Sequence, residues 1–297
     1  MEKVKLVVAM LIVGSIGIFV HFIPLPSAVI AMFRAVIGTL FLLGVMIFKK
    51  TKIDWAVVKK NAKYLIISGT AIGFNWIFLF EAYQYTSVAV ATLCYYMAPA
   101  FVVLLAPFVL NEKMTIYNLM STVAALFGAV LISGVIGGVQ VNLIGVGYGI
   151  GAAVLYAWIM ILNKKTKGLP GLELTFFQLL VSAVVMVPYV FLTEDLSGLS
   201  FTPSVLGLLL IVGVVHTGWV YQLFFEALNK LPAQTSSLLS YIDPVTAIIL
   251  SAVLLHQPLS KIQIVGTLFI LGSAVMNEVF NFRKQRSSVP KQSENLI

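Results

Sequence analysis

The chain has 297 residues, of which 60% are hydrophobic and only 10% are charged. A soluble domain carries roughly a quarter charged residues, so this composition excludes a water-soluble fold and predicts an integral membrane protein. The net charge of +8 does not indicate nucleic-acid binding, because the basic residues lie between apolar segments. The single cysteine, Cys94, excludes an intramolecular disulfide and a cysteine-based zinc site.

Ten apolar segments follow one another, and each is close to the ~20 residues that cross about 30 Å of hydrocarbon. Those of the first half are Val4–Phe22, Ser27–Phe48, Ala62–Ala82, Val88–Leu110 and Ile116–Ile136. Those of the second half are Leu143–Leu162, Leu172–Leu192, Ser204–Leu228, Ala233–Leu255 and Ile262–Phe280. The predicted fold class is therefore an all-α polytopic membrane protein with ten transmembrane helices.

The segments between the spans are short. Before the first span, Lys3 and Lys5 resemble the start of a signal peptide, but no small-x-small cleavage site follows before Pro24, so we expect a retained first span. The lysine-rich stretch Lys49–Lys63 is expected to lie on the lipid headgroups. The polar tail, residues 283–297, is expected to be a disordered cytoplasmic segment.

Basic residues predict the orientation of the chain in the membrane. With the N-terminus in the cytoplasm, all of the 19 lysines and arginines except Arg34 and Lys261 fall on the cytoplasmic side or its tail. Ten crossings return the C-terminus to the same side. We therefore expect a multi-pass protein of the cytoplasmic membrane with both termini inside, and the positive charge indicates topology and contact with anionic lipid.

One unit occurs twice in the chain. An offset of 145 positions aligns Gly73 with Gly218, Phe80 with Phe225, Glu81 with Glu226, Tyr96 with Tyr241, and Pro99 with Pro244. Because each half holds five spans, an odd number, the two halves should cross the membrane in opposite directions, as in many secondary transporters. The predicted repeats are residues 1–137 and 138–282.

Glycines four residues apart predict close helix contacts. Gly69 and Gly73 form one such pair in the third span, and the sixth span carries four glycines, Gly145, Gly147, Gly149 and Gly151, on two faces. The sixth span also matches G-x-G-x-x-A, but a nucleotide site would need a preceding strand in a βαβ unit. Helix packing is the better interpretation.

A proline in the middle of a span occurs in both repeats. Pro99 and Pro244 each deprive a carbonyl four residues back, that of Tyr95 or Ser240, of its helical donor. With Tyr96 and Tyr241 nearby, these oxygens could line a polar substrate site between the repeats. The alternative is a kink that only shapes packing.

Aromatic and acidic side chains within the spans are further candidates. Trp158 and Trp219 are the aromatic residues favoured for substrate binding, although packing explains most aromatics in spans. Asp243 lies close to mid-membrane and could bind a substrate amine or carry a proton; a protonated acid bonded to a neighbouring helix is the alternative.

Four more charged or titratable residues are candidates for gating or coupling. Arg34 could reach outward to water or form an extracellular latch with Glu81. Glu81 and Glu226 end their spans, so simple contact with water is an equal possibility. His216 could relay protons or be a satisfied core imidazole.

The paired pattern resembles that of the EamA-type members of the drug/metabolite transporter (DMT) superfamily. It comprises Phe-Glu-Ala at 80–82 and 225–227, Tyr-x-x-Pro at 96–99 and 241–244, and a short turn that ends at Thr115 in the first repeat and at Ser260 in the second. Thr115 and Ser260 are candidate N-caps of the helices that follow. The resemblance implies ten helices around a central cavity, alternating access, and export of small metabolites such as amino acids. The chain departs from the family pattern at Gln257, where the first repeat has Glu112.

The predicted function is secondary active transport of a small amphipathic metabolite across the cytoplasmic membrane, with export the favoured direction. The expected partners are this solute, the lipid bilayer and, if the transport is coupled, protons; monomer and homodimer stay open. No cofactor, metal, nucleic acid or enzymatic activity is predicted. The alternatives are an intramembrane enzyme acting on a lipid-linked substrate and a metabolite channel.

Overall fold

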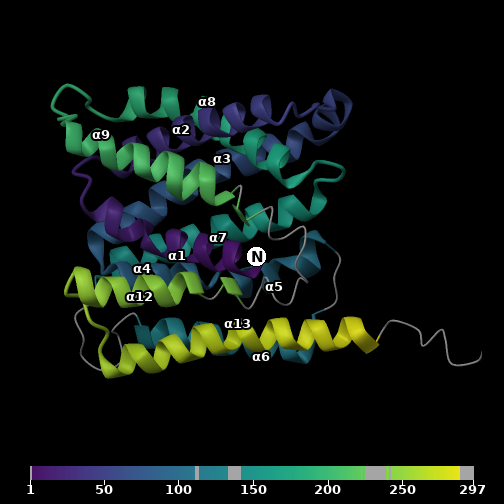
Figure 1. Ribbon diagram of the computed structural model, residues 1–297. Coiled ribbons are helices and arrows are strands. Elements are labelled where there is room, and N and C mark those ends of the chain that lie inside the picture. Colours follow the sequence, from purple (N-terminus) through teal and green to yellow (C-terminus); the bar gives the residue numbers. More distant parts are fainter. Residues whose placement is uncertain are drawn as a thin grey trace, which may run out of the picture.

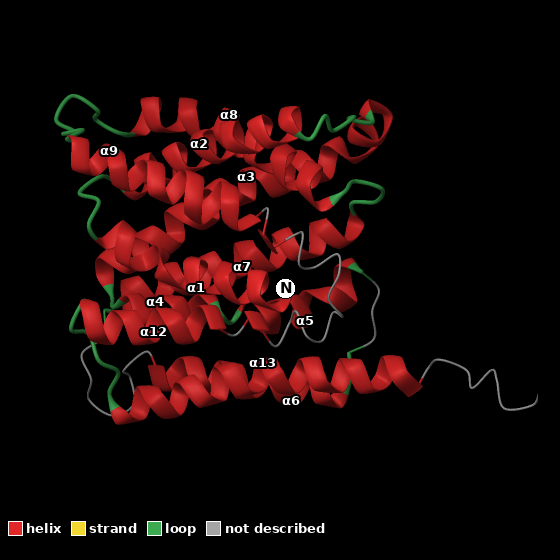
Figure 2. Cartoon of the chain, in the orientation of Figure 1, coloured by secondary structure: helices red, strands yellow, loops and turns green. Residues whose placement is uncertain are grey.

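The computed structural model describes residues 2–110, 114–132, 142–221, 223–224, 239–240 and 242–287, and every regular element in these ranges is helical (Figures 1 and 2). The first half contains α1 (Glu2–His21), α2 (Ser27–Phe48), α3 (Trp55–Tyr85), α4 (Val88–Tyr95), α5 (Ala98–Val109) and α6 (Ile116–Ile132). The second half contains α7 (Leu143–Lys165), α8 (Gly171–Thr193), α9 (Pro203–Leu210), the π-helix η1 (Ile211–Trp219), α12 (Ile242–Leu254) and α13 (Lys261–Ser287).

Six helical segments are long and apolar enough to cross a membrane. Five of them are single helices, α1, α2, α3, α7 and α8, and the sixth is Val88–Val109, which combines α4 and α5. Four further apolar helices are shorter over the described residues, namely α6, α9 with η1, α12, and Lys261–Met276 of α13. Large apolar side chains on the outside, such as Phe48, Phe108 and Leu192, are 84–88% exposed. Such a surface suits lipid, because in water it would be a large apolar patch.

Two helices extend seven residues beyond the bounds predicted from sequence, α3 at its start and α13 at its end. α3 begins at Trp55 rather than Ala62, because Asp54 caps it by accepting hydrogen bonds from the N–H groups of Ala56 (2.9 Å) and Val57 (3.3 Å). The lysine-rich stretch is therefore partly the start of this helix. α13 continues to Ser287, so residues 283–287 of the expected disordered tail are helical, and residues 288–297 lie outside the described residues.

The predicted N-caps are confirmed. The Thr115 hydroxyl accepts a hydrogen bond from the N–H of Asn118 at 3.2 Å, at the start of α6. At the start of α13, the Ser260 hydroxyl accepts from the N–H of Gln263 at 3.3 Å, and the Gln263 side chain accepts from the N–H of Ser260 at 3.0 Å. This reciprocal pair is a capping box, which fixes where the last helix begins.

The fourth predicted span is broken rather than bent. α4 ends at Tyr95, Tyr96 and Met97 form a turn, and α5 begins at Ala98 with Pro99 in its first turn. The N–H groups of Tyr96 and Met97 bond to Thr92 and Cys94. A proline is tolerated in a first helical turn, where its missing N–H has no helical partner to lose, so the break accommodates Pro99.

Glycines set the closest helix contacts, as predicted. A methyl group added to Gly145 would lie 2.9 Å from Thr86, and one on Gly149 2.8 Å from Cys94, so this face of α7 packs against α4 and the turn before it. Gly151 faces Phe78 of α3 at 2.7 Å, whereas Gly147 has open space around it. Three of the four glycines of this span therefore mark tight contacts.

Two glycine contacts are exchanged by the repeat offset. Gly73 of α3 packs against Met186 of α8, and Gly218 of η1 packs against Phe41 of α2. The offset of 145 positions converts Gly73 into Gly218 and Phe41 into Met186, so one contact becomes the other. The two halves are therefore packed against each other through equivalent positions.

The pair α6 and α13 lies along one edge of the bundle, at the bottom of Figure 1. The two helices cross at Gly128 and Gly266, where a methyl group on either glycine would lie 2.7 Å from the carbonyl oxygen of the other. α6 also contacts α4 and α5, so the pair is joined to the remaining helices through the broken fourth span.

The basic segments 49–54 and 164–167 lie at the same end of the bundle. Asn61 of α3 donates to the Lys167 carbonyl at 2.9 Å and accepts from the Lys167 N–H at 3.2 Å. At the opposite end, Gln257 accepts hydrogen bonds from the N–H of Val88 (3.3 Å) and the hydroxyl of Ser251 (3.1 Å). The amide that replaces the first repeat's glutamate thus joins the end of α12 to the start of α4.

Candidate functional site

A hydrogen bond joins the two repeats at the predicted site. Tyr96 caps the C-terminus of α4, Asp243 lies in the first turn of α12, and the Tyr96 hydroxyl donates to Oδ2 of Asp243. Gly14 of α1 makes this placement possible, because a methyl group there would lie 2.5 Å from the Asp243 carbonyl oxygen. Both side chains are half-buried, and Pro244 beside them is buried.

A second tyrosine extends this polar group toward α3 and α7. The Tyr95 ring stacks on Tyr156 of α7 with centroids 5.1 Å apart, and its hydroxyl lies 3.5 Å from Oδ1 of Asn75. Asn75 is buried and donates to the Ala152 carbonyl at 2.6 Å. The break after Tyr95 therefore presents two adjacent tyrosines in different directions, one to Asp243 and one to Asn75.

Arg34 is buried inside the bundle, with 7% of its surface exposed. Its Nε donates to the Thr217 hydroxyl of η1 at 2.8 Å, and its guanidinium carbon lies 4.0 Å from the centre of the Trp76 ring. Among the described residues, which include Glu81, no carboxylate forms an ion pair with Arg34. The latch between Arg34 and Glu81 is therefore not formed in this structure. The guanidinium instead stacks on Trp76, which belongs to the same helix as Glu81.

His216 occupies the neighbouring turn of η1. It is buried, its Nε2 lies 3.0 Å from the Ser15 hydroxyl of α1, and its ring meets Phe19 edge-on at 4.7 Å. Nδ1 lies 3.4 Å from the carbonyl oxygen of Ile211, five residues back, as the wider turn of a π-helix allows. Every polar atom of the ring thus has a protein neighbour.

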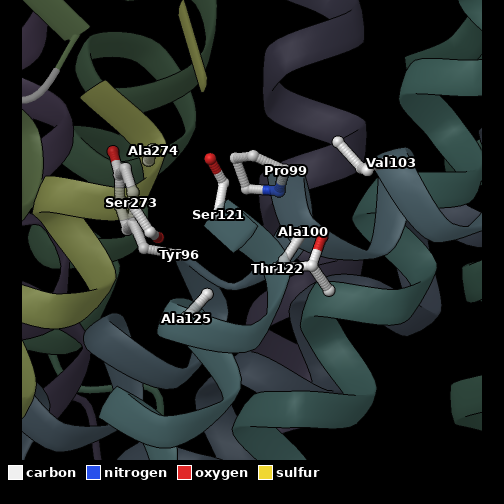
Figure 3. Close-up of a pocket in the computed structure, with 9 residues that line it drawn as sticks. All are labelled: Tyr96, Pro99, Ala100, Val103, Ser121, Thr122, Ala125, Ser273 and Ala274. Carbon is white, nitrogen blue, oxygen red and sulfur yellow. The ribbon is translucent and has the colours of Figure 1, made fainter. Parts of the chain in front are cut away.

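A small cavity adjoins Tyr96 on the side of α6 and α13. It measures ≈ 10 Å³, which is about the space that the centre of one water molecule needs. Figure 3 shows its lining residues: Tyr96, Pro99, Ala100, Val103, Ser121, Thr122, Ala125, Ser273 and Ala274. The Ser121 hydroxyl is buried there without a hydrogen-bond partner in the described part of the chain, so a water molecule in this cavity would satisfy it.

The two tryptophans favoured from sequence do not join this group of residues. Trp158 and Trp219 are 38% and 43% exposed. Residues two apart lie about 200° apart around an α-helix, so the stacking of Tyr156 on Tyr95 turns Trp158 away from that contact. Ser240 is half-buried and described, whereas Tyr241 and Glu226 lie outside the described residues.

Three features of the site were not predicted from sequence: Tyr156 as the stacking partner, Thr217 as the partner of Arg34, and the π-helix η1. Tyr156 could not be chosen over Trp158 because a span that is apolar on all faces shows no periodicity that marks an inward side. For Thr217 the sequence offers one signal: it is a polar residue within an apolar span, next to His216. The π-helix has no signal of its own in the sequence.

One family model matches the chain twice, and several curated relatives that resemble the chain are named as transporters. The EamA-like transporter family matches residues 4–134 and again residues 143–278. The uncharacterized transporter YxxF of Bacillus subtilis (strain 168) is 32% identical over 84% of this chain and 80% of its own length. The uncharacterized transporter YoaV of the same organism is 25% identical over 88% of this chain and 90% of its own.

Two further matches have lower sequence identity but also cover most of the chain. Protein PecM of Dickeya dadantii (strain 3937) is 24% identical over 79% of this chain and 80% of its own length. One solved crystal structure superposes with a TM-score of 0.66 at 17% identity, covering 96% of this chain and 98% of that one, which shows a shared fold. With two family matches covering most of its length, the chain is a multi-pass membrane protein that belongs to the EamA-like transporter family.

Proposed function

We propose that this chain is a secondary active transporter that exports a small amphipathic metabolite, such as an amino acid, across the cytoplasmic membrane by alternating access. The observation that carries the proposal is the hydrogen bond from Tyr96 to Asp243, which links a broken helix of one repeat to the proline-bearing helix of the other. Transporter sites form where interrupted helices of two repeats meet. The relatives named as transporters support the same class.

The proposed architecture is two inverted five-helix repeats. The exchange of the contacts Gly73–Met186 and Gly218–Phe41 by the repeat offset supports equivalent halves. Five crossings in each half would place them in opposite orientations, with both termini in the cytoplasm. The two halves could then rock about the contact between α4 and α12, opening the Tyr96–Asp243 pair to one side of the membrane at a time.

Asp243 is the proposed coupling residue. A carboxylate in a span is costly unless it is paired or protonated, and in this structure Tyr96 supplies its hydrogen bond. A substrate amine would compete with Tyr96 for the Asp243 carboxylate, and a proton on Asp243 would weaken the bond by removing the negative charge that accepts it, so either would loosen the contact between α12 and α4. The adjoining cavity, which has room for one water molecule, would give the Tyr96 side of this pair a polar neighbour.

Counterflow in proteoliposomes tests the function. Vesicles loaded with unlabelled amino acids should take up a radiolabelled amino acid mixture with saturable kinetics. Chemical conversion of a lipid-linked substrate would instead favour the enzyme alternative, and unsaturated flux would favour a channel.

The same vesicles test the role of Asp243. Asp243→Asn should abolish accumulation driven by a proton gradient while leaving exchange intact, because the amide keeps the hydrogen-bonding shape but cannot carry the proton. Asp195→Asn is the matched control, since Asp195 lies in an exposed loop and bonds only to Ser197 among the described residues. Equal gradient dependence in Asp243→Asn and the parent would remove Asp243 from the coupling mechanism.

A further inference from the structure

Arg34 carries a buried positive charge that the protein itself only partly satisfies. Its Nε has a partner in Thr217. Within the described ranges, no side chain or carbonyl accepts a hydrogen bond from its two terminal nitrogens, and Lys5 with Glu2 form the ion pair found there. Four N–H donors of a guanidinium, aligned in one plane, are therefore available to a ligand.

The setting of Arg34 makes an unpaired charge expensive. Buried charges in proteins are paired, and those within membrane spans face a partner or a functional cavity. Stacking on Trp76 at 4.0 Å offsets part of the cost. The Arg34 side chain does not reach outward to water, because α3 and η1 cover it and leave 7% of its surface exposed.

The neighbours of Arg34 belong to the site already described. Tyr95 is influenced electrostatically by both Arg34 and Asp243, and its ring meets that of Tyr96, the partner of Asp243, edge-on with the centroids 6.3 Å apart. Tyr221 and Tyr83 also lie within range of Arg34. A ligand on the free edge of the guanidinium would therefore touch aromatic rings on its apolar part, next to the residues that join α4 to α12.

We infer that Arg34 binds the carboxylate of the transported solute, whose apolar part lies against Trp76 and the tyrosines. The planar fork of a guanidinium matches the two oxygens of a carboxylate. A single buried arginine balances a singly charged carboxylate, whereas a phosphate dianion would leave a net negative charge near Asp243. This inference deepens the proposed function and rests on it, because it names the chemical class of the substrate.

Matched acids and amides test the inference. The full chain in lipid nanodiscs is heated with each amino acid and, separately, with its primary amide, which keeps the shape and the amine but lacks the carboxylate. We expect at least one free acid to raise the melting temperature while its amide does not. A parent protein stabilised equally by acid and amide, or by no acid at all, would overturn the assignment.

Variants of Arg34 identify the residue responsible. Arg34→Gln should weaken binding of the stabilising acid on the order of 10-fold to 100-fold, the range expected for hydrogen bonds to a charged group, and should leave the amide unaffected. The affinity of Arg34→Lys for the acid should lie between those of the parent and Arg34→Gln, because lysine keeps the charge without the planar fork. If Arg34→Gln does not fold, Arg34→Lys, which keeps the charge and removes the planar fork, provides the same comparison. Unchanged acid binding in the folded variants contradicts the inference.

The counterflow assay separates this result from the proposed function. Saturable exchange of an amine or a neutral solute, at a rate that Arg34→Gln does not change, would refute the carboxylate site but not the proposed transport function. Absence of saturable exchange for every solute would instead refute transport itself.

Discussion

Buried amide side chains connect three helices at the scale of single residues. Gln178 of α8 is 3% exposed and donates to the Ser68 hydroxyl of α3 at 2.8 Å and to Oδ1 of Asn163 of α7 at 2.7 Å. In a bilayer these bonds have no competing water, although the unfolded chain in the membrane also finds partners, so each adds only about 0.6 kcal/mol.

Gln178→Leu should therefore lower the free energy of unfolding in lipid by about 1 kcal/mol, because Ser68 and Asn163 lose a common donor. The measurement is the unfolding equilibrium of purified protein in nanodiscs or mixed micelles. Thr193→Val on the same helix is the control, since Thr193 is exposed and bonds to the Tyr189 carbonyl within its own helix. A Gln178→Leu protein as stable as the parent would show that this connection contributes nothing.

The crossing of α6 and α13 illustrates how elements are held together. The backbones touch at Gly128 and Gly266, and a methyl group on Gly266 would lie 2.7 Å from the Gly128 carbonyl oxygen, which is backbone and cannot rotate away. Close approach of backbones is what drives helix association in lipid, where apolar burial adds little. Two helices that contact the remaining bundle mainly through α4 and α5 depend on this crossing.

Gly266→Ala should separate the two helices and destabilise the protein by about 1–3 kcal/mol, the usual cost of overpacking. Gly272→Ala in the same helix is the matched control, because a methyl group there meets nothing within 4 Å and alanine favours a helix over glycine. Thermal unfolding of the two variants should shift in opposite directions. Equal stability of Gly266→Ala and Gly272→Ala would argue against a tight crossing.

At the scale of the whole molecule, the distribution of lysines should fix the orientation. Lys167 is bonded to Asn61 at one end of the bundle, and α8 then runs for 23 residues to the loop that holds Ser197. Such a helix is about 35 Å long, enough to place the two positions on opposite sides of a bilayer.

Single cysteines can test this orientation, since the natural Cys94 is buried and should give no background. A membrane-impermeant maleimide should label Ser197→Cys in intact cells, and Lys167→Cys only after the cells are permeabilised. Each variant serves as the control for the other, because both sites are exposed. The opposite labelling pattern would reverse the predicted topology and place the termini outside.

The sequence by itself determined the membrane environment, the positions of the apolar segments, the duplication and the family. Hydropathy, helix caps at Thr115 and Ser260, and glycine spacing are local properties, so the chain records them directly. It also led to Tyr96 and Asp243, because a proline and an acid within a span are rare and costly.

Tertiary structure alone decided which side chains meet. A span that is apolar on every side has no preferred inward face in its sequence, so Tyr156 rather than Trp158 faces Tyr95. Arg34 meets Thr217, a partner 183 positions away, instead of Glu81, because a π-helical turn and a glycine at position 38 bring η1 against α2. Such contacts depend on how whole helices pack, and packing is a property of the assembled bundle.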